Sequence, residues 1–80
     1  MALDPAIYCY QIKVAGRVSP DWTDWLNGLS ITLESDSPPI TILSGVIIDQ
    51  ARLRGILNKL WDLNLELISL ERNVYTGGLP

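Results

Sequence analysis

The fold is decided by the central stretch LSITLESDSPPITILSGV, which covers residues 29–46. Its first six residues alternate strictly between apolar and polar side chains, the pattern of a strand with one buried face. Residues 35–39 contain aspartate, serine and two prolines, a composition typical of a loop. Apolar and β-branched residues then return over 40–46. The stretch therefore predicts a hairpin of two short strands.

Upstream of this hairpin, the sequence predicts a strand and then a short helix. Alternation over residues 7–18 indicates a strand whose core-facing residues are Tyr8, Tyr10, Ile12 and Val14. Ser19-Pro20-Asp21 predicts a helix start, because serine caps backbone N–H groups, proline suits the first helical position and aspartate is favoured by the helix dipole. We expect the helix to end near Gly28 and to present an apolar stripe made of Trp22, Trp25, Leu26 and Leu29.

Downstream of the hairpin, the sequence predicts a second helix and a last strand. Asp49 precedes a helix whose apolar face consists of Leu53, Ile56, Leu57, Leu60 and Trp61. Asn64 tolerates the left-handed conformation that would end this helix. Residues 65–71 then form the final strand, whose blurred alternation does not assign which face is buried. Because the chain has no phenylalanine, we expect Trp25 and Trp61 to supply bulk to the core.

This order of elements is that of an α+β, ferredoxin-like split βαβ domain over residues 7–72. Right-handed crossovers predict a four-stranded antiparallel sheet in the order 4-1-3-2, with both helices on one face. In this arrangement we expect strands 1 and 3 to lie parallel at the centre. Residues 1–6 are expected to form a loose lead, and residues 73–80 a frayed tail.

Composition restricts the classes of function. The 80 residues carry a net charge of −3, and the six basic residues are dispersed along the chain, which disfavours nucleic-acid binding. There is no histidine and only one cysteine, so we expect no metal, no cofactor and no histidine-based catalysis. The chain has no apolar run long enough to span a membrane, and its first residues lack the pattern of a signal peptide. We therefore expect a cytoplasmic protein.

One edge of the expected sheet would collect polar groups from separate parts of the chain. If strands 1 and 3 are parallel, their carboxyl ends bring both helix starts together, which gives a candidate recognition edge made of Arg17, Asp21, Trp22, Asp49 and Gln50. A structural interpretation competes with this one. Ser19 and Asp49 would then cap their own helices, and Gln50 would bond to backbone across the two loops.

Several of these residues also carry a resemblance. Three groups of segments resemble a family of short uncharacterised bacterial proteins. They are Trp22-Thr-Asp-Trp25-Leu-Asn-Gly28-Leu29, then Leu43-Ser-Gly45 with Asp49-Gln50-Ala51-Arg-Leu53, and finally Asp62-Leu63 with Leu67-Ile68-Ser69. The pattern of that family runs W-[ST]-D-W-x-x-G-L, L-x-G-x-x-x-D-Q-A-x-L and D-L-x-L-x-L-[IL]-S. The resemblance covers most of residues 10–70 and implies no established activity.

Three functions remain open. The first is a non-enzymatic protein-interaction or regulatory module, which could be a homodimer joined through the open sheet face or an edge strand. The second is a small-ligand sensor of the amino-acid-binding type, whose ligand would lie near the loop after the first strand. The third is a small acylphosphatase-like enzyme, which would need an arginine-bearing phosphate cradle in that loop and a catalytic asparagine, and Arg17 alone matches.

Overall fold

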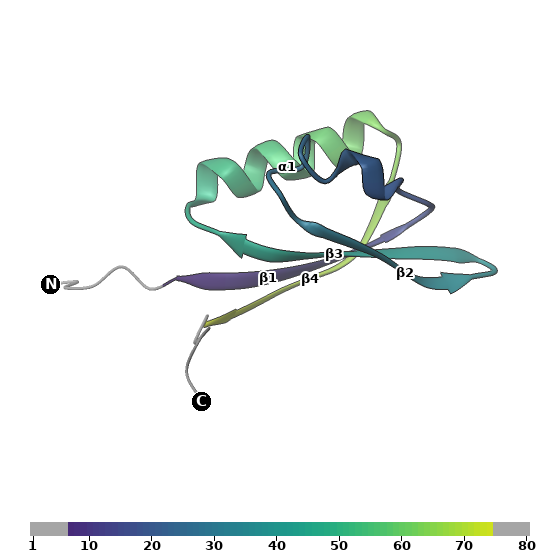
Figure 1. Ribbon diagram of the computed structural model, residues 1–80, viewed down its shortest axis with the longest axis horizontal. Helices are drawn as coiled ribbons and strands as arrows, with labels where there is room; N and C mark the ends of the chain where they lie inside the picture. Colours follow the sequence, from purple (N-terminus) through teal and green to yellow (C-terminus); the bar gives the residue numbers. More distant parts are fainter. Residues whose placement is uncertain (1–6, 75–80) are drawn as a thin grey trace, which may run out of the picture.

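The computed structural model describes residues 7–74 and has the element order strand, short helix, two strands, helix, strand. The elements are β1 (Tyr8–Ala15), the 3₁₀ turn η1 (Pro20–Trp22), β2 (Ser30–Asp36), β3 (Pro39–Ile47), α1 (Gln50–Asp62) and β4 (Glu66–Val74). Figure 1 shows α1 and η1 on the same face of the sheet. The expected lead at 1–6 and most of the expected tail, 75–80, lie outside the described residues, whereas Asn73 and Val74 continue β4.

The four strands form an antiparallel sheet in the order β2-β3-β1-β4. The expected order 4-1-3-2 names the same neighbours counted from the β4 edge, but the orientation that we attached to it is wrong. β1 and β3 are antiparallel, with Tyr8 opposite Ile47 and Ala15 opposite Ile40. The reason is the hairpin, because its tight turn reverses β3 relative to β2, and β2 runs in the same direction as β1.

The helix α1 forms as the sequence predicts. Asp49 caps it, since an Asp49 carboxylate oxygen accepts a hydrogen bond of 2.8 Å from the backbone N–H of Arg52. Leu53, Ile56 and Leu60 recur at helical spacing and are buried against the sheet. Asn64 follows the helix in the left-handed conformation, with a φ of 62°. Burial of one apolar stripe therefore fixes α1 on the sheet.

The prediction of a helix between Ser19 and Gly28 is wrong, because only the short turn η1 forms there. Ser19 caps this turn by accepting a hydrogen bond of 3.2 Å from the Asp21 backbone N–H. The chain then continues through irregular turns to Asn27 and Gly28, which both have positive φ. So short a segment gains few backbone hydrogen bonds for the cost of nucleation, and tryptophan, threonine and asparagine are weak helix formers.

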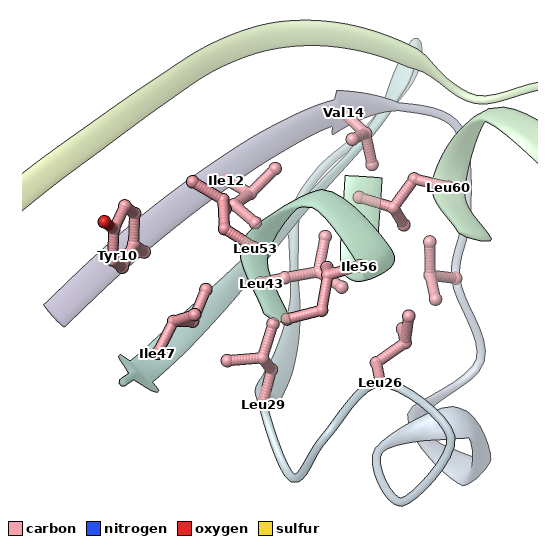
Figure 2. Packing of buried hydrophobic residues seen from close by; sticks show 11 residues of the cluster. Tyr10, Ile12, Val14, Leu26, Leu29, Leu43, Ile47, Leu53, Ile56 and Leu60 are labelled. Atoms are coloured by element: carbon pink, nitrogen blue, oxygen red, sulfur yellow. The ribbon is translucent and has the colours of Figure 1, made fainter. Parts of the chain in front are cut away.

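The core forms between the sheet and these two segments (Figure 2). Tyr10, Ile12 and Val14 of β1 are buried in it, as expected from their alternation, and Tyr8 packs against it. Leu26 and Leu29 enter the same cluster from the segment after η1, and both are almost fully buried. The described residues contain no helix that is long and apolar enough to cross a membrane.

The tryptophans lie outside this core, so the prediction that Trp25 and Trp61 would fill it is wrong. Trp25 is 44% exposed and Trp61 is 54% exposed. Aliphatic side chains occupy the positions beneath them, because Leu26 and Leu60 take the inward-facing places next to each tryptophan. Spacing identifies an apolar side of each segment, but the sheet contacts only part of that side.

A β-bulge in β4 explains why the alternation of the last strand is blurred. The register along β1 shifts between Lys13 and Val14, which lie opposite Ser69 and Leu67. Ile68 is the additional residue. The bulge lets Leu67 and Leu70 face the same side of the sheet, opposite the buried residues Val14 and Ile12.

Candidate functional site

An apolar groove lies between the loop after β1 and the edge strand β2. Its volume is about 560 Å³, and we call it the Trp22 groove; its lining residues are Arg17, Val18, Ser19, Pro20, Trp22, Ile31 and Leu33. Val18 is buried, whereas Trp22 is 37% exposed and Leu33 is 43% exposed. The groove is therefore an open apolar surface with half-exposed walls.

The groove exists because the first crossover is short. Ile31 and Leu33 lie opposite Leu43 and Thr41, which are both buried, so these β2 side chains point to the face that carries α1. A full helix after β1 would cover this part of the sheet. The single turn η1 leaves Ile31 half-buried and Leu33 exposed beside Trp22.

The wall formed by the loop is held firmly to the hairpin. The Gly16 backbone N–H donates a hydrogen bond of 2.8 Å to the carbonyl of Pro39, and the Thr41 hydroxyl donates one of 2.6 Å to the carbonyl of Gly16. Gly16 has a φ of 123°, and a Cβ atom there would lie 2.7 Å from the side chain of Leu65. Glycine is therefore required at the point where β1 leads into the loop that lines the groove.

Arg17, which lines the groove, belongs to an ion pair. The guanidinium of Arg17 forms an ion pair with the carboxylate of Asp36 at the end of β2. Both side chains are largely exposed, at 60% and 74%, so the pair contributes little to stability. Asp21 lies in η1 between two residues that line the groove, Pro20 and Trp22. Arg17 is therefore the charged residue of the groove lining, and its partner Asp36 lies outside that lining.

An aromatic contact joins the groove to α1. The rings of Trp22 and Trp25 meet edge to face, with their centroids 5.8 Å apart. The Lys59 ammonium lies 5.2 Å from the centroid of the Trp25 ring and donates a hydrogen bond of 2.7 Å to the Trp25 carbonyl. Lys59 therefore connects the segment after η1 to the last turns of α1 and supports the tryptophan pair from behind.

The expected recognition edge is divided between the two ends of the sheet. Arg17, Asp21 and Trp22 follow β1, whereas Asp49 and Gln50 follow β3, and antiparallel strands end at opposite ends. The Gln50 side-chain N–H donates a hydrogen bond of 3.1 Å to the hydroxyl oxygen of Tyr10, near the start of β1. Our interpretation of Gln50 as a clasp between the two loops is wrong, since it connects α1 to β1.

A second, smaller groove runs along α1 and was not predicted from the sequence. Its volume is about 390 Å³, and its lining residues are Gln50, Leu53, Arg54, Leu57, Asn58 and Trp61. The signal for it is the width of the apolar stripe. Leu57 and Trp61 extend the stripe beyond the positions buried by the sheet, and they leave an apolar strip at the surface.

The chemistry that these surfaces offer is apolar contact with a few charges at the rim. Within residues 7–74, no three side chains of histidine, cysteine, aspartate or glutamate gather in a way that could hold a metal ion. The single cysteine, Cys9, is free and partly exposed. Both grooves are instead bounded by tryptophan, a residue enriched at energetically dominant positions of protein interfaces.

Comparison with known proteins identifies a family. No curated protein and no solved structure matches the chain. A family model described as a domain of unknown function (DUF8691) matches residues 9–71, which include all of η1, β2, β3 and α1 and most of β1 and β4. The chain therefore belongs to the DUF8691 family.

Proposed function

We propose that the domain is a non-enzymatic protein-interaction module that binds a segment of a partner protein in the Trp22 groove. The observation that carries the proposal is the placement of the tryptophans: all three lie at the surface, and Trp22 forms a wall of an open apolar groove. Burying the exposed parts of Trp22 and Leu33 against a partner would remove apolar surface from water, which favours association.

The geometry around Trp22 suits a binding surface. Its ring is held by the edge-to-face contact with Trp25, and Trp25 is held in turn by Lys59. The opposite wall is a strand of the sheet, and the loop at the base is fixed by Gly16 and Thr41. A surface already ordered before binding loses little conformational entropy when a partner docks.

A small-ligand sensor is the second candidate, and the size of the groove favours it. About 560 Å³ falls within the roughly 300 to 1,000 Å³ that is usual for ligand pockets. Such pockets, however, bury about 70 to 90% of their ligand. The side chains of Trp22, Leu33 and Arg17 are partly exposed in the open groove, so a small ligand there would remain largely in contact with water. A longer protein segment would cover these side chains.

An acylphosphatase-like enzyme and an edge-paired dimer have weaker support. A phosphate cradle would need the Arg17 guanidinium, which is bound by Asp36. Edge pairing needs flat strand edges, but the register of β2 against β3 shifts around Glu34, and β4 carries the bulge at Ile68 beside the charged residues Glu71 and Arg72. Bulges and charges of this kind protect sheet edges from pairing.

The proposal is tested by selecting short random peptides, displayed on phage, against the immobilised domain. We expect enriched peptides whose affinity falls about tenfold or more in Trp22→Ala. Trp61→Ala is the matched control, because Trp61 is more exposed and lies in the other groove. Binding that survives Trp22→Ala would contradict the proposal.

A thermal-shift screen with amino acids and other small metabolites tests the sensor instead. A ligand present at 100 times its dissociation constant should stabilise the domain by about 2.7 kcal/mol. If one such compound stabilises the wild type but not Trp22→Ala, the groove belongs to a small ligand. A dimer that Trp22→Ala dissociates, measured by light scattering, would identify the partner as a second copy of the chain.

A further inference from the structure

Lys59 differs from the ion-paired cations of the domain. Lys13, Arg17 and Arg52 each lie within ion-pair distance of a carboxylate. Lys59 is half-buried and forms no ion pair with any of the described residues. Its ammonium instead lies over the Trp25 ring and donates a hydrogen bond to the Trp25 carbonyl, which is 34 positions away in the chain. Two contacts to the same residue therefore fix the position of this cation.

The residue that Lys59 contacts lies in an irregular segment. Residues 23–28 follow η1 as turns and not as a regular helix. Among residues 7–74, the Trp25 carbonyl accepts a hydrogen bond from Lys59 and from no backbone N–H. The neighbouring Leu26 is fully buried in the same core as Leu60 of α1 (Figure 2). Burial of Leu26 thus holds the segment on the sheet, whereas Lys59 holds the exposed ring of Trp25.

The contact continues from Trp25 to the wall of the Trp22 groove. The rings of Trp22 and Trp25 meet edge to face, and Trp22 lines the groove whereas Trp25 does not. Lys59 also lies outside the groove lining. A contact made by Lys59 would therefore influence the groove through the two indole rings.

We propose that Lys59 is a positioning residue of the Trp22 groove, whose ammonium orients the Trp22 ring through Trp25 before a partner segment binds. This inference rests on the proposed function and adds a residue that controls binding from outside the groove. A ring that is free to rotate must be immobilised when a partner docks, and this immobilisation lowers affinity. The positive charge is required because the face of an indole ring attracts a cation, whereas a neutral chain of similar length lacks that attraction.

The binding test compares Lys59→Met with Arg54→Met, because both remove one positive charge from α1. Arg54 lines the other groove and forms no cation–π contact among the described residues. With the peptides enriched on the wild-type domain, we expect Lys59→Met to weaken binding about three- to tenfold. Arg54→Met should change the affinity less than about twofold. Lys59→Arg should also stay within about twofold, because a guanidinium can stack on the ring and donate to the carbonyl.

Circular dichroism of the unbound domain tests the orientation of the rings without any peptide. Two indole rings in contact couple their electronic transitions and give paired positive and negative bands in the far ultraviolet, which Trp22→Ala should remove. Lys59→Met should reduce these bands, whereas Arg54→Met and Lys59→Arg should retain them. The thermal midpoint of each variant verifies that it is folded.

A double-mutant cycle tests whether Lys59 acts through Trp25. Trp25→Ala removes the ring over which the ammonium lies. In that background, we expect Lys59→Met to weaken peptide binding by less than about twofold. If the two losses of affinity are independent, the positioning role is overturned, because Lys59 would then act on the peptide directly through its charge.

The outcomes separate this inference from the proposed function. Lys59→Met with unchanged affinity, with or without a lower thermal midpoint, would overturn the positioning role and leave the interaction module standing. Unchanged dichroism in Lys59→Met, or equal loss of affinity in Arg54→Met, would also overturn it. Peptides that bind Trp22→Ala as well as they bind the wild type would overturn the proposed function and this inference together.

Discussion

The two halves of the domain use different connections to cover the same sheet. Between β3 and β4, the helix α1 packs Leu53, Ile56 and Leu60 into the core. Between β1 and β2, the turn η1 and the segment after it contribute Leu26 and Leu29, while Trp22 and Trp25 remain exposed. The β3–β4 half is closed by a regular helix, and the β1–β2 half stays partly open. The difference shows that a shorter crossover leaves part of this sheet face uncovered, as an open apolar groove.

The sharpest test of this comparison contrasts two neighbouring residues in the β1–β2 half. Leu26→Ala should lower the free energy of unfolding by about 2 to 5 kcal/mol, because the side chain is fully buried and its loss leaves a cavity. Trp25→Ala removes a larger side chain but should cost about 1 kcal/mol. Urea denaturation measures both. A larger loss for Trp25→Ala would mean that this half is closed by its tryptophans.

The next test concerns the attachment of the groove wall to the hairpin. Thr41→Val keeps the shape of a fully buried side chain but removes the hydroxyl that donates to the Gly16 carbonyl. We expect a loss of about 1 to 2 kcal/mol in the free energy of unfolding, because that carbonyl loses a buried partner. Thr32→Val on the exposed face of β2 is the control and should stay within about 0.5 kcal/mol. Equal effects would show that the wall does not depend on Thr41.

The attachment of α1 in the β3–β4 half gives a smaller expected effect. Gln50→Ala removes the hydrogen bond to the Tyr10 hydroxyl and should cost about 0.5 to 1.5 kcal/mol. In a double-mutant cycle with Tyr10→Phe, the two losses should not add. Full additivity would show that the two side chains do not interact in solution.

The smallest expected effect is at the rim of the groove. Arg17→Ala breaks an exposed ion pair with Asp36 and should change the free energy of unfolding by less than about 0.5 kcal/mol. Its effect should add to that of Gln50→Ala, because the two residues lie at opposite ends of the sheet. Coupling between the two substitutions in the double mutant would support the shared edge that the sequence suggested.

Much of the secondary structure could be predicted because its signals are local. The hairpin has strict alternation before a loop rich in proline and a stretch of apolar and β-branched residues after it, and α1 has a capping aspartate followed by a long apolar stripe. The residues after Pro20 carry the same kinds of signal over a shorter distance. At that length, a regular helix and a tighter turn satisfy the pattern equally well, and packing against the sheet decides between them.

The candidate site could be predicted only in part, because it depends on contacts between distant residues. Arg17 and Trp22 were identified from their position after the first strand, and both line the groove. Leu33 belongs to the alternating stretch that predicts a strand with one buried face, and nothing local indicates that η1 would leave it uncovered. The partner of Gln50 lies 40 positions away in the chain. The separation of the two loops follows from strand direction, which the hairpin settles once β1 and β2 run the same way.

The pairing of Tyr8 with Val74 has a practical consequence for how the domain can be attached to other molecules. The first and last residues of the sheet sit side by side on adjacent strands, at the end away from the Trp22 groove (Figure 1). A tag, a second domain or a solid support joined through either strand would start from that far end. A tether on either side therefore attaches the domain at the end opposite the groove, and a linker between the two positions would permit a circular permutation that leaves every strand intact.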